Sequence, residues 1–78
     1  MRPLRREAEV TEHVYKVVEL VGTSKTGVDD AIQTAITRAS ATLRNLRWFE
    51  VAQVRGAVGG DGKVDHYQVT LKAGFTLE

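Results

Sequence analysis

The sequence contains no cysteine, so a disulfide framework, a thiolate nucleophile and a sulfur-ligated metal site are excluded. An excess of one charge is also missing, because 11 basic residues are set against 10 acidic ones and the formal net charge is +1. This balance gives no general attraction to nucleic acid or to a membrane surface, and we predict neither as a partner. Aromatic residues make up only 6% of the chain and include a single tryptophan. The chemistry open to a functional site is therefore narrow.

Long hydrophobic runs are absent as well. No segment approaches the ~20 apolar residues that a membrane-spanning helix needs, and the start of the chain has no apolar stretch of the signal-peptide type. Residues 1–13 mix arginine and glutamate without an apolar period, which predicts a flexible arm ahead of the fold. We expect a soluble, cytoplasmic protein.

Residues 14–78 carry enough apolar sequence for one domain. The chain has 78 residues, of which 42% are hydrophobic, and this content excludes a disordered protein. A domain of this size buries only about 60% of the surface that its unfolded chain exposes. Because no disulfide can compensate, self-association is the remaining source of stability, and we expect a homo-oligomer.

One helix is predicted in the first half of the domain. Thr26 and Asp29 have the spacing of a capping box, so the helix should begin near Gly27. Arg44 and Arg47 should lie near its C-terminus, where positive charge suits the helix dipole. An apolar stripe with intervals of three and four residues covers about five turns and consists of Val28, Ile32, Ala35, Ile36, Ala39, Leu43 and Leu46.

Three segments are predicted as strands. Residues 14–21 and 48–54 are rich in β-branched and aromatic side chains. A glycine-rich turn at residues 59–62 precedes a last strand at 64–77. The element order is therefore β-α-β-β, an α+β domain. A right-handed crossover followed by a hairpin would place the third strand between the first and the second.

Alternation assigns the strand residues to two faces of the sheet. In the last strand Val69 and Leu71 belong to the set that should face the helix, and Gln68 belongs to the opposite set. Trp48 alternates with Phe49, which leaves the indole on the outward side, near Gln68. One helix covers one face of such a sheet, so the outward side should carry an apolar patch of the kind found at interfaces. Its predicted members are Trp48, Val54, and either Val18 with Leu20 or Val17 with Val21.

No residue pattern indicates catalysis or a metal site. His13 and His66 lack a partner at motif spacing and are interpreted as surface residues. The segment from Gly22 to Gly27 lacks the lysine and the hydroxyl residue of a phosphate-binding loop. We therefore predict no catalytic residue, no metal ligand and no enzyme activity.

Trp48 and Gln68 are the candidate binding residues. A lone tryptophan is more often a core anchor than a ligand platform, but the strand position of Trp48 argues against the core. Its indole is a broad electron-rich plane, and the carboxamide of Gln68 offers both a donor and an acceptor. Such a pair can stack on a flat heterocycle and recognise its edge. The pattern by itself indicates a small oligomeric domain with an aromatic ligand site.

Five segments resemble the dodecin family, in the same order and at similar spacing. The resemblance covers residues 14–78 and implies an antiparallel three-stranded sheet wrapped around one helix, with twelve subunits assembled as a hollow homododecamer. The segments are VYKVVELVGTS at 14–24, WFEV at 48–51, VRG at 54–56, YQV at 67–69 and GFTLE at 74–78.

The resemblance also implies flavin binding. In the family, flavins bind as stacked pairs between tryptophans of neighbouring subunits. Trp48 would thus stack on the isoalloxazine ring, and Gln68 would hydrogen-bond its pyrimidine edge. The similarity to bacterial members implies flavin mononucleotide (FMN), with riboflavin as the other flavin. Arg55, in the matching VRG segment, is the candidate for contact with the FMN phosphate, because a guanidinium fork suits phosphate geometry. Thr76 stands where many bacterial relatives have a basic residue, so the resemblance implies no phosphate contact from that position.

The position of Arg55 raises a geometric question. Seven residues separate it from Trp48, so in an unbroken strand the two side chains point to opposite faces. A bulge or a neighbouring subunit would have to bring them together.

The implied function is storage or buffering of flavin and its photoprotection through quenching by Trp48. Two alternatives stay open. One is an oligomer that binds another planar or phosphorylated ligand, such as a coenzyme A-type nucleotide. The other is a flavin-dependent reductase, which is disfavoured because stacking on both faces of the flavin leaves no approach for a hydride.

Overall fold

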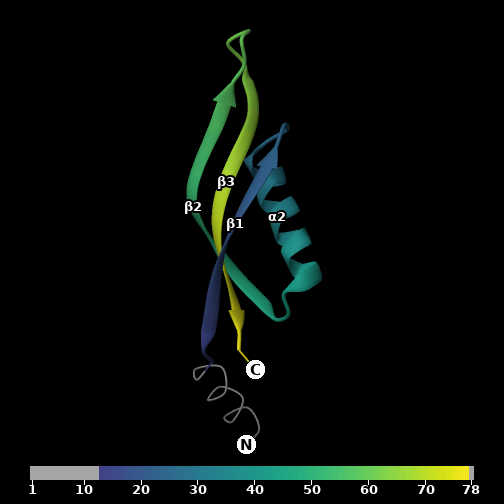
Figure 1. Cartoon of the computed structure of the whole chain (residues 1–78), viewed down its shortest axis with the longest axis vertical. Helices are drawn as coiled ribbons and strands as arrows, with labels where there is room; N and C mark the ends of the chain where they lie inside the picture. Colours follow the sequence, from purple (N-terminus) through teal and green to yellow (C-terminus); the bar gives the residue numbers. More distant parts are fainter. Residues whose placement is uncertain (1–12, 78) are drawn as a thin grey trace, which may run out of the picture.

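Residues 13–77 are described by the computed structural model, which shows one helix on one side of a three-stranded sheet (Figure 1). Both strand pairings are antiparallel, and the strand order is β1-β3-β2. The predicted α+β class, the element order and the central place of the last strand are confirmed. Of the arm predicted at residues 1–13, only His13 lies within the described residues. The elements are β1 (Tyr15–Ser24), α2 (Val28–Thr42), β2 (Leu46–Val58) and β3 (Val64–Thr76).

The helix α2 begins directly after Gly27, as predicted, but a different side chain organises its start. The Oγ of Ser24 accepts hydrogen bonds from the backbone N–H of Thr26 at 2.9 Å and of Gly27 at 3.3 Å. It also donates to Oδ2 of Asp30 at 2.7 Å. The predicted capping box of Thr26 and Asp29 is wrong, since no side chain caps the helix at Gly27. Ser24 instead ties the end of β1 to the first turn of α2.

The helix ends about one turn earlier than the apolar stripe predicts. Leu43 is already extended, with φ −100° and ψ 132°, and Asn45 has a positive φ of 62°, which asparagine adopts more readily than most residues. Leu46 then begins β2. The predicted placement of Arg44 and Arg47 at the helix C-terminus is wrong for the same reason, because the last turn of α2 contains no basic residue.

The core lies between α2 and the strands β1 and β3. Ala31, Val69 and Leu71 are fully buried and form its centre, with Leu20 packed against them. A side chain at Gly22 would overlap the backbone of Ala31, so this glycine lets the helix approach β1 closely. The predicted helix-facing set of the last strand is confirmed for Val69 and Leu71.

The strand β2 contains a bulge that changes which residues share a face. Its register against β3 slips by one residue at Ala52. Beyond the bulge Val54 lies opposite Val69, on the helix side, so the prediction that Val54 shares a face with Trp48 is wrong. The helix packs chiefly against β1 and β3, and the exposed helix-side residues of β2 are Phe49, Val51 and Val54.

Candidate functional site

The sheet face turned away from α2 carries the candidate site, and we call it the outer face. Directly paired residues of antiparallel strands point to the same side, so the register assigns strand residues to a face. Val17 and Val21 fall on the outer face, which decides between the two alternatives that the sequence left open. The outer face comprises Tyr15, Val17, Glu19, Val21 and Thr23 of β1, Trp48, Glu50, Gln53 and Arg55 of β2, and Gln68, Thr70, Lys72, Gly74 and Thr76 of β3.

Trp48 occupies one end of the outer face, opposite Gly74. The Nε1, Cε2 and Cζ2 atoms of its indole fill the space that a side chain at Gly74 would need, so the indole rests on the backbone of β3. Its ring packs against Tyr15 of β1, with 5.9 Å between the ring centroids and 69° between the planes. Trp48 nevertheless stays 39% exposed. We call Tyr15, Trp48 and Gly74 the aromatic end.

Thr76 lies beside the aromatic end but offers no charge to a ligand. It pairs with Tyr15 across the strands and is only 4% exposed. Its Oγ1 is buried without a hydrogen-bond partner among the described residues. Thr76 therefore offers no cation to a ligand on the outer face.

Arg55 and Gln68 lie at the other end of the outer face. Arg55 pairs with Gln68 on one side of β3, and Thr23 pairs with Gln68 on the other. The bulge at Ala52 explains why Arg55 shares a face with Trp48 despite their odd spacing. We call Thr23, Gln68 and Arg55 the polar end.

A hollow of about 440 Å³ adjoins the polar end and is lined by Thr23, Ser24, Lys25 and His66. The Nδ1 of His66 lies 2.8 Å from Oδ2 of Asp65. This hydrogen bond, together with the positive charge of Lys25, lowers the pKa of Asp65. Both side chains of the pair are substantially exposed, in keeping with the interpretation of His66 as a surface residue.

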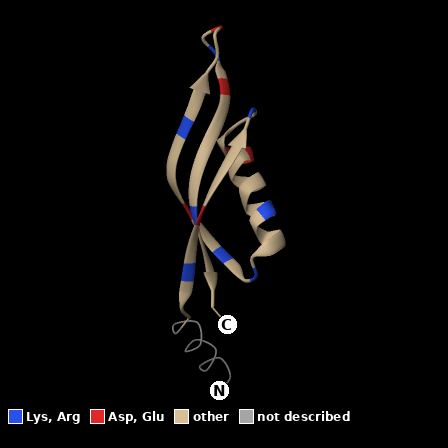
Figure 2. Cartoon of the chain, in the orientation of Figure 1, with Lys and Arg blue, Asp and Glu red and all other residues tan. Residues whose placement is uncertain are grey.

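Charged residues occupy the middle of the outer face. Lys72 on the central strand pairs with Glu19 of β1 and with Glu50 of β2. Figure 2 shows one blue segment between two red ones where the strands cross. Opposite charges on neighbouring strands favour pairing of the strands. This row separates the aromatic end from the polar end.

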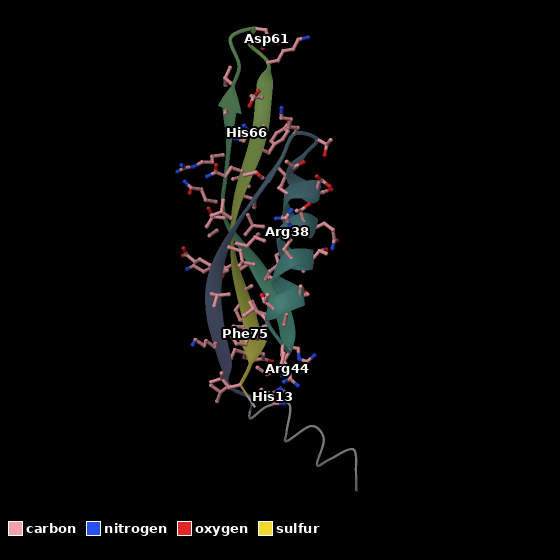
Figure 3. All side chains as sticks on the ribbon, turned by 45° about the vertical axis from the view of Figure 1, so that its right-hand side comes forward. His13, Arg38, Arg44, Asp61, His66 and Phe75 are labelled. Atoms are coloured by element: carbon pink, nitrogen blue, oxygen red, sulfur yellow. The ribbon has the colours of Figure 1, made fainter. Side chains whose placement is uncertain are left out.

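The two ends are far apart within one chain. Gly74 and Gln68 are six residues apart on β3, which corresponds to about 20 Å of strand. Figure 3 shows the labelled His13 near one end of the sheet and His66 towards the other. Trp48 and Gln68 share a face as predicted, but in one chain they are too far apart to touch the same small ring.

Two residues of the aromatic end, Tyr15 and Gly74, were not predicted from the sequence as site residues. The signal for Gly74 was available, because a glycine inside a strand often marks a place where another group approaches the backbone closely. Tyr15 gave no comparable signal, since a tyrosine at the start of a strand is common. Its importance comes from a contact with β2, which is distant in the sequence.

The described residues show neither a metal site nor a membrane span. Between residues 13 and 77, no group of three or more histidine, aspartate or glutamate side chains is arranged to hold a metal ion. In the same stretch, α2 lacks the length and the hydrophobicity that crossing a membrane requires.

The single helix, the β1-β3-β2 sheet and the open outer face define a small α+β subunit with a candidate ligand surface. The sequence model of the dodecin family matches residues 14–78. The chain therefore belongs to the dodecin family, and the resemblance seen in the sequence is confirmed.

Three relatives show how far the similarity extends. The dodecin of Thermus thermophilus is 58% identical over 65 residues, which are 83% of this chain and 93% of that protein. The structure of dodecin from Streptomyces coelicolor is 60% identical with a TM-score of 0.80, and the match covers 87% of this chain and 96% of that one. The calcium dodecin of Mycobacterium tuberculosis is 33% identical over 64 residues, which are 82% of this chain and 89% of that protein.

Proposed function

We propose that the protein binds FMN between copies of itself in the cytoplasm and stores it in a form protected from photochemistry. The observation that carries this proposal is the exposed indole of Trp48, seated on an outer face whose other end presents Gln68 and Arg55. Membership of the dodecin family supports the same ligand class. Riboflavin, which has no phosphate, should bind at the same site with lower affinity.

The separation of the two ends implies that one site needs two chains. An isologous contact about a two-fold axis that brings two aromatic ends together creates two identical sites at once. Trp48 of one copy then stacks on the isoalloxazine ring, and Gln68 of another copy hydrogen-bonds its pyrimidine edge. Two flavins related by the axis stack between two tryptophans. Repetition of this contact in a closed homododecamer adds the stability that so small a core lacks.

Arg55 is the proposed phosphate ligand. Arg55 lies directly opposite Gln68. A ligand that is hydrogen-bonded to the Gln68 carboxamide therefore has its phosphate-bearing chain within reach of the Arg55 guanidinium. A guanidinium presents donors in a planar fork that suits phosphate oxygens. Thr76 cannot replace it, because Thr76 is buried and uncharged. Arg55 therefore accounts for a preference for FMN over riboflavin.

Trp48 supplies the protective chemistry. An indole in van der Waals contact with an excited flavin donates an electron and recovers it by back transfer, so the absorbed energy is lost as heat. Enclosure between tryptophans also keeps a hydride donor away from both faces of the ring. An enzyme would need a substrate positioned against the flavin. We assign no residue to that task and no enzyme activity to the protein.

Titration of the apoprotein into FMN, followed by flavin fluorescence, tests this function. We expect quenching that saturates at roughly one flavin per chain in the proposed stacked-pair arrangement. Trp48→Ala should weaken binding and restore emission, whereas Trp48→Phe should keep a stacking ring but quench less. Emission that stays at the level of free FMN throughout the titration contradicts the proposal. Binding of a coenzyme A-type nucleotide, measured by calorimetry, would then be the function to examine.

A further inference from the structure

The indole of Trp48 extends across the sheet from β2 towards β1. Trp48 belongs to one edge strand, its Nε1–Cε2–Cζ2 edge covers Gly74 of the central strand, and its ring meets Tyr15 of the other edge strand. The centroid distance of 5.9 Å and the interplanar angle of 69° are those of an edge-to-face pair, which aromatic rings prefer over a face-to-face sandwich. All three strands therefore contribute to the seat of one side chain.

Gly74 cannot fix the indole without help. A tryptophan side chain turns about two torsions, and a glycine beneath it provides space without a lateral stop. Tyr15 provides the stop from the side of β1. It pairs with Thr76, two residues beyond Gly74 on the same face, so its ring reaches the indole from the direction of the strand end.

Tyr15 is itself held in place. It begins β1 as the partner of Thr76, and the backbone pairing continues beyond it through a hydrogen bond of 3.0 Å from Leu77 N–H to the carbonyl oxygen of Val14. The ring of His13 also packs against the ring of Tyr15, with 6.3 Å between the centroids and 82° between the planes. Tyr15 is still 41% exposed, so burial in the core does not account for its ring.

We propose that Tyr15 is a positioning residue, whose phenol ring holds the indole of Trp48 in the orientation that stacks on a flat heterocyclic ligand. A stacked ligand makes full contact only with an indole already ordered in the right plane, and ordering it on binding costs affinity. Tyr15 thus acts on the ligand through Trp48. Because this role rests on the flavin function proposed above, its test needs one measurement that does not involve flavin.

Substitution of Tyr15 provides that test. Tyr15→Leu keeps apolar bulk but removes the ring edge, while Tyr15→Phe keeps the ring and removes only the hydroxyl. The chain has a single tryptophan, so time-resolved fluorescence anisotropy of the apoprotein reports on Trp48 alone. We expect faster local depolarisation in Tyr15→Leu and an FMN dissociation constant raised about 3- to 10-fold. Tyr15→Phe should stay within about 2-fold of the unmodified protein.

The control removes an exposed side chain far from the indole. Val58→Ala should leave the anisotropy and the FMN affinity unchanged, because Val58 is 75% exposed and pairs with Val64, at the opposite end of the β2–β3 ladder from Trp48. Size-exclusion chromatography and the thermal midpoint confirm that each variant is folded and assembled. If Tyr15→Leu does not assemble, Tyr15→Met is measured in its place with the same expected results.

The outcomes separate the two proposals. If the unmodified protein does not bind FMN, the flavin function fails, while the anisotropy still decides whether Tyr15 orders the indole. If it binds FMN and Tyr15→Leu matches it in anisotropy and affinity, the positioning role is overturned and the flavin function stands. A loss in Tyr15→Phe as large as that in Tyr15→Leu also overturns it, because the hydroxyl and not the ring would then be responsible.

Discussion

The indole of Trp48 occupies the volume above Gly74 that any other residue would fill with its own Cβ. A glycine inside a strand weakens a sheet, and this one lies on the central strand. The indole of Trp48 packs on the backbone at Gly74, and this contact offsets part of the stability that a glycine costs the strand. The candidate ligand platform is therefore built from both residues, and changing either one should affect it.

Gly74→Ala should displace the indole and disturb the sheet beneath it. Overpacking of this kind lowers the free energy of unfolding by about 1–3 kcal/mol, and the displaced ring should bind FMN more weakly. Chemical unfolding at fixed protein concentration and the fluorescence titration measure the two effects. Gly60→Ala is the matched control, because a Cβ at Gly60 meets no atom within 4 Å. Stability and quenching at the unmodified level in Gly74→Ala would show that the indole has room to move.

Arg55→Ala should weaken FMN binding by about 10-fold, because a hydrogen-bonded charge pair with the phosphate is lost. Riboflavin affinity should hardly change, since riboflavin has no phosphate. Arg38→Ala is the control, as Arg38 is an exposed arginine on α2 (Figure 3). Parallel titrations with both flavins give the ratio of affinities. An equal loss for the two flavins would assign Arg55 to the fold and not to the phosphate.

Ser24→Ala should lower the free energy of unfolding by about 1–2 kcal/mol. The variant leaves the backbone N–H groups of Thr26 and Gly27 and the carboxylate of Asp30 without their shared partner. Ser40→Ala, at an exposed position of α2, should have little effect. Urea unfolding compares the two variants. A similar small change in both would mean that water replaces the Ser24 hydroxyl at no cost.

Asp65→Asn should destabilise the protein slightly at neutral pH but not in acid. The hydrogen bond from His66, and then the charge of Lys25, lower the pKa of Asp65 below its usual 3.8. A carboxylate with a lowered pKa in the folded chain stabilises the fold above its unfolded pKa and loses this contribution as the pH falls through the folded pKa. The gap in thermal midpoint between the two proteins should therefore close below pH 3.8. A gap that persists in strong acid would need another cause.

Periodicity predicted most of the fold because strand and helix patterns are local. The outward position of Trp48 and of Gln68 follows from alternation within each strand, and the register confirms it. The face of Arg55 could not be predicted in this way. Odd- and even-numbered residues of β2 exchange faces at the bulge, so counting residues from Trp48 gives the wrong face for Arg55. An alanine such as Ala52 gives no sign of a bulge in the sequence.

The helix end and the distance between the two ends of the site depended on tertiary structure. Leu43 and Leu46 continue the helical spacing although the chain has already become extended at Leu43. The separation of Trp48 from Gln68 depends on which residues pair across β2 and β3. Strand residues alone fix only the face, so two candidate residues on one face appeared closer than they are.

The strand order has a consequence for how the chain folds as it is made. β1 and β2 do not pair with each other, because β3 lies between them. During synthesis both strands leave the ribosome before their common neighbour, and of the elements between residues 13 and 77 the helix α2 is the early one that forms from local contacts. The arrival of β3 then supplies the partner strand for both ladders. Until that moment two unpaired strands are open to association with other chains, so speed in making this one segment protects the nascent protein from aggregation.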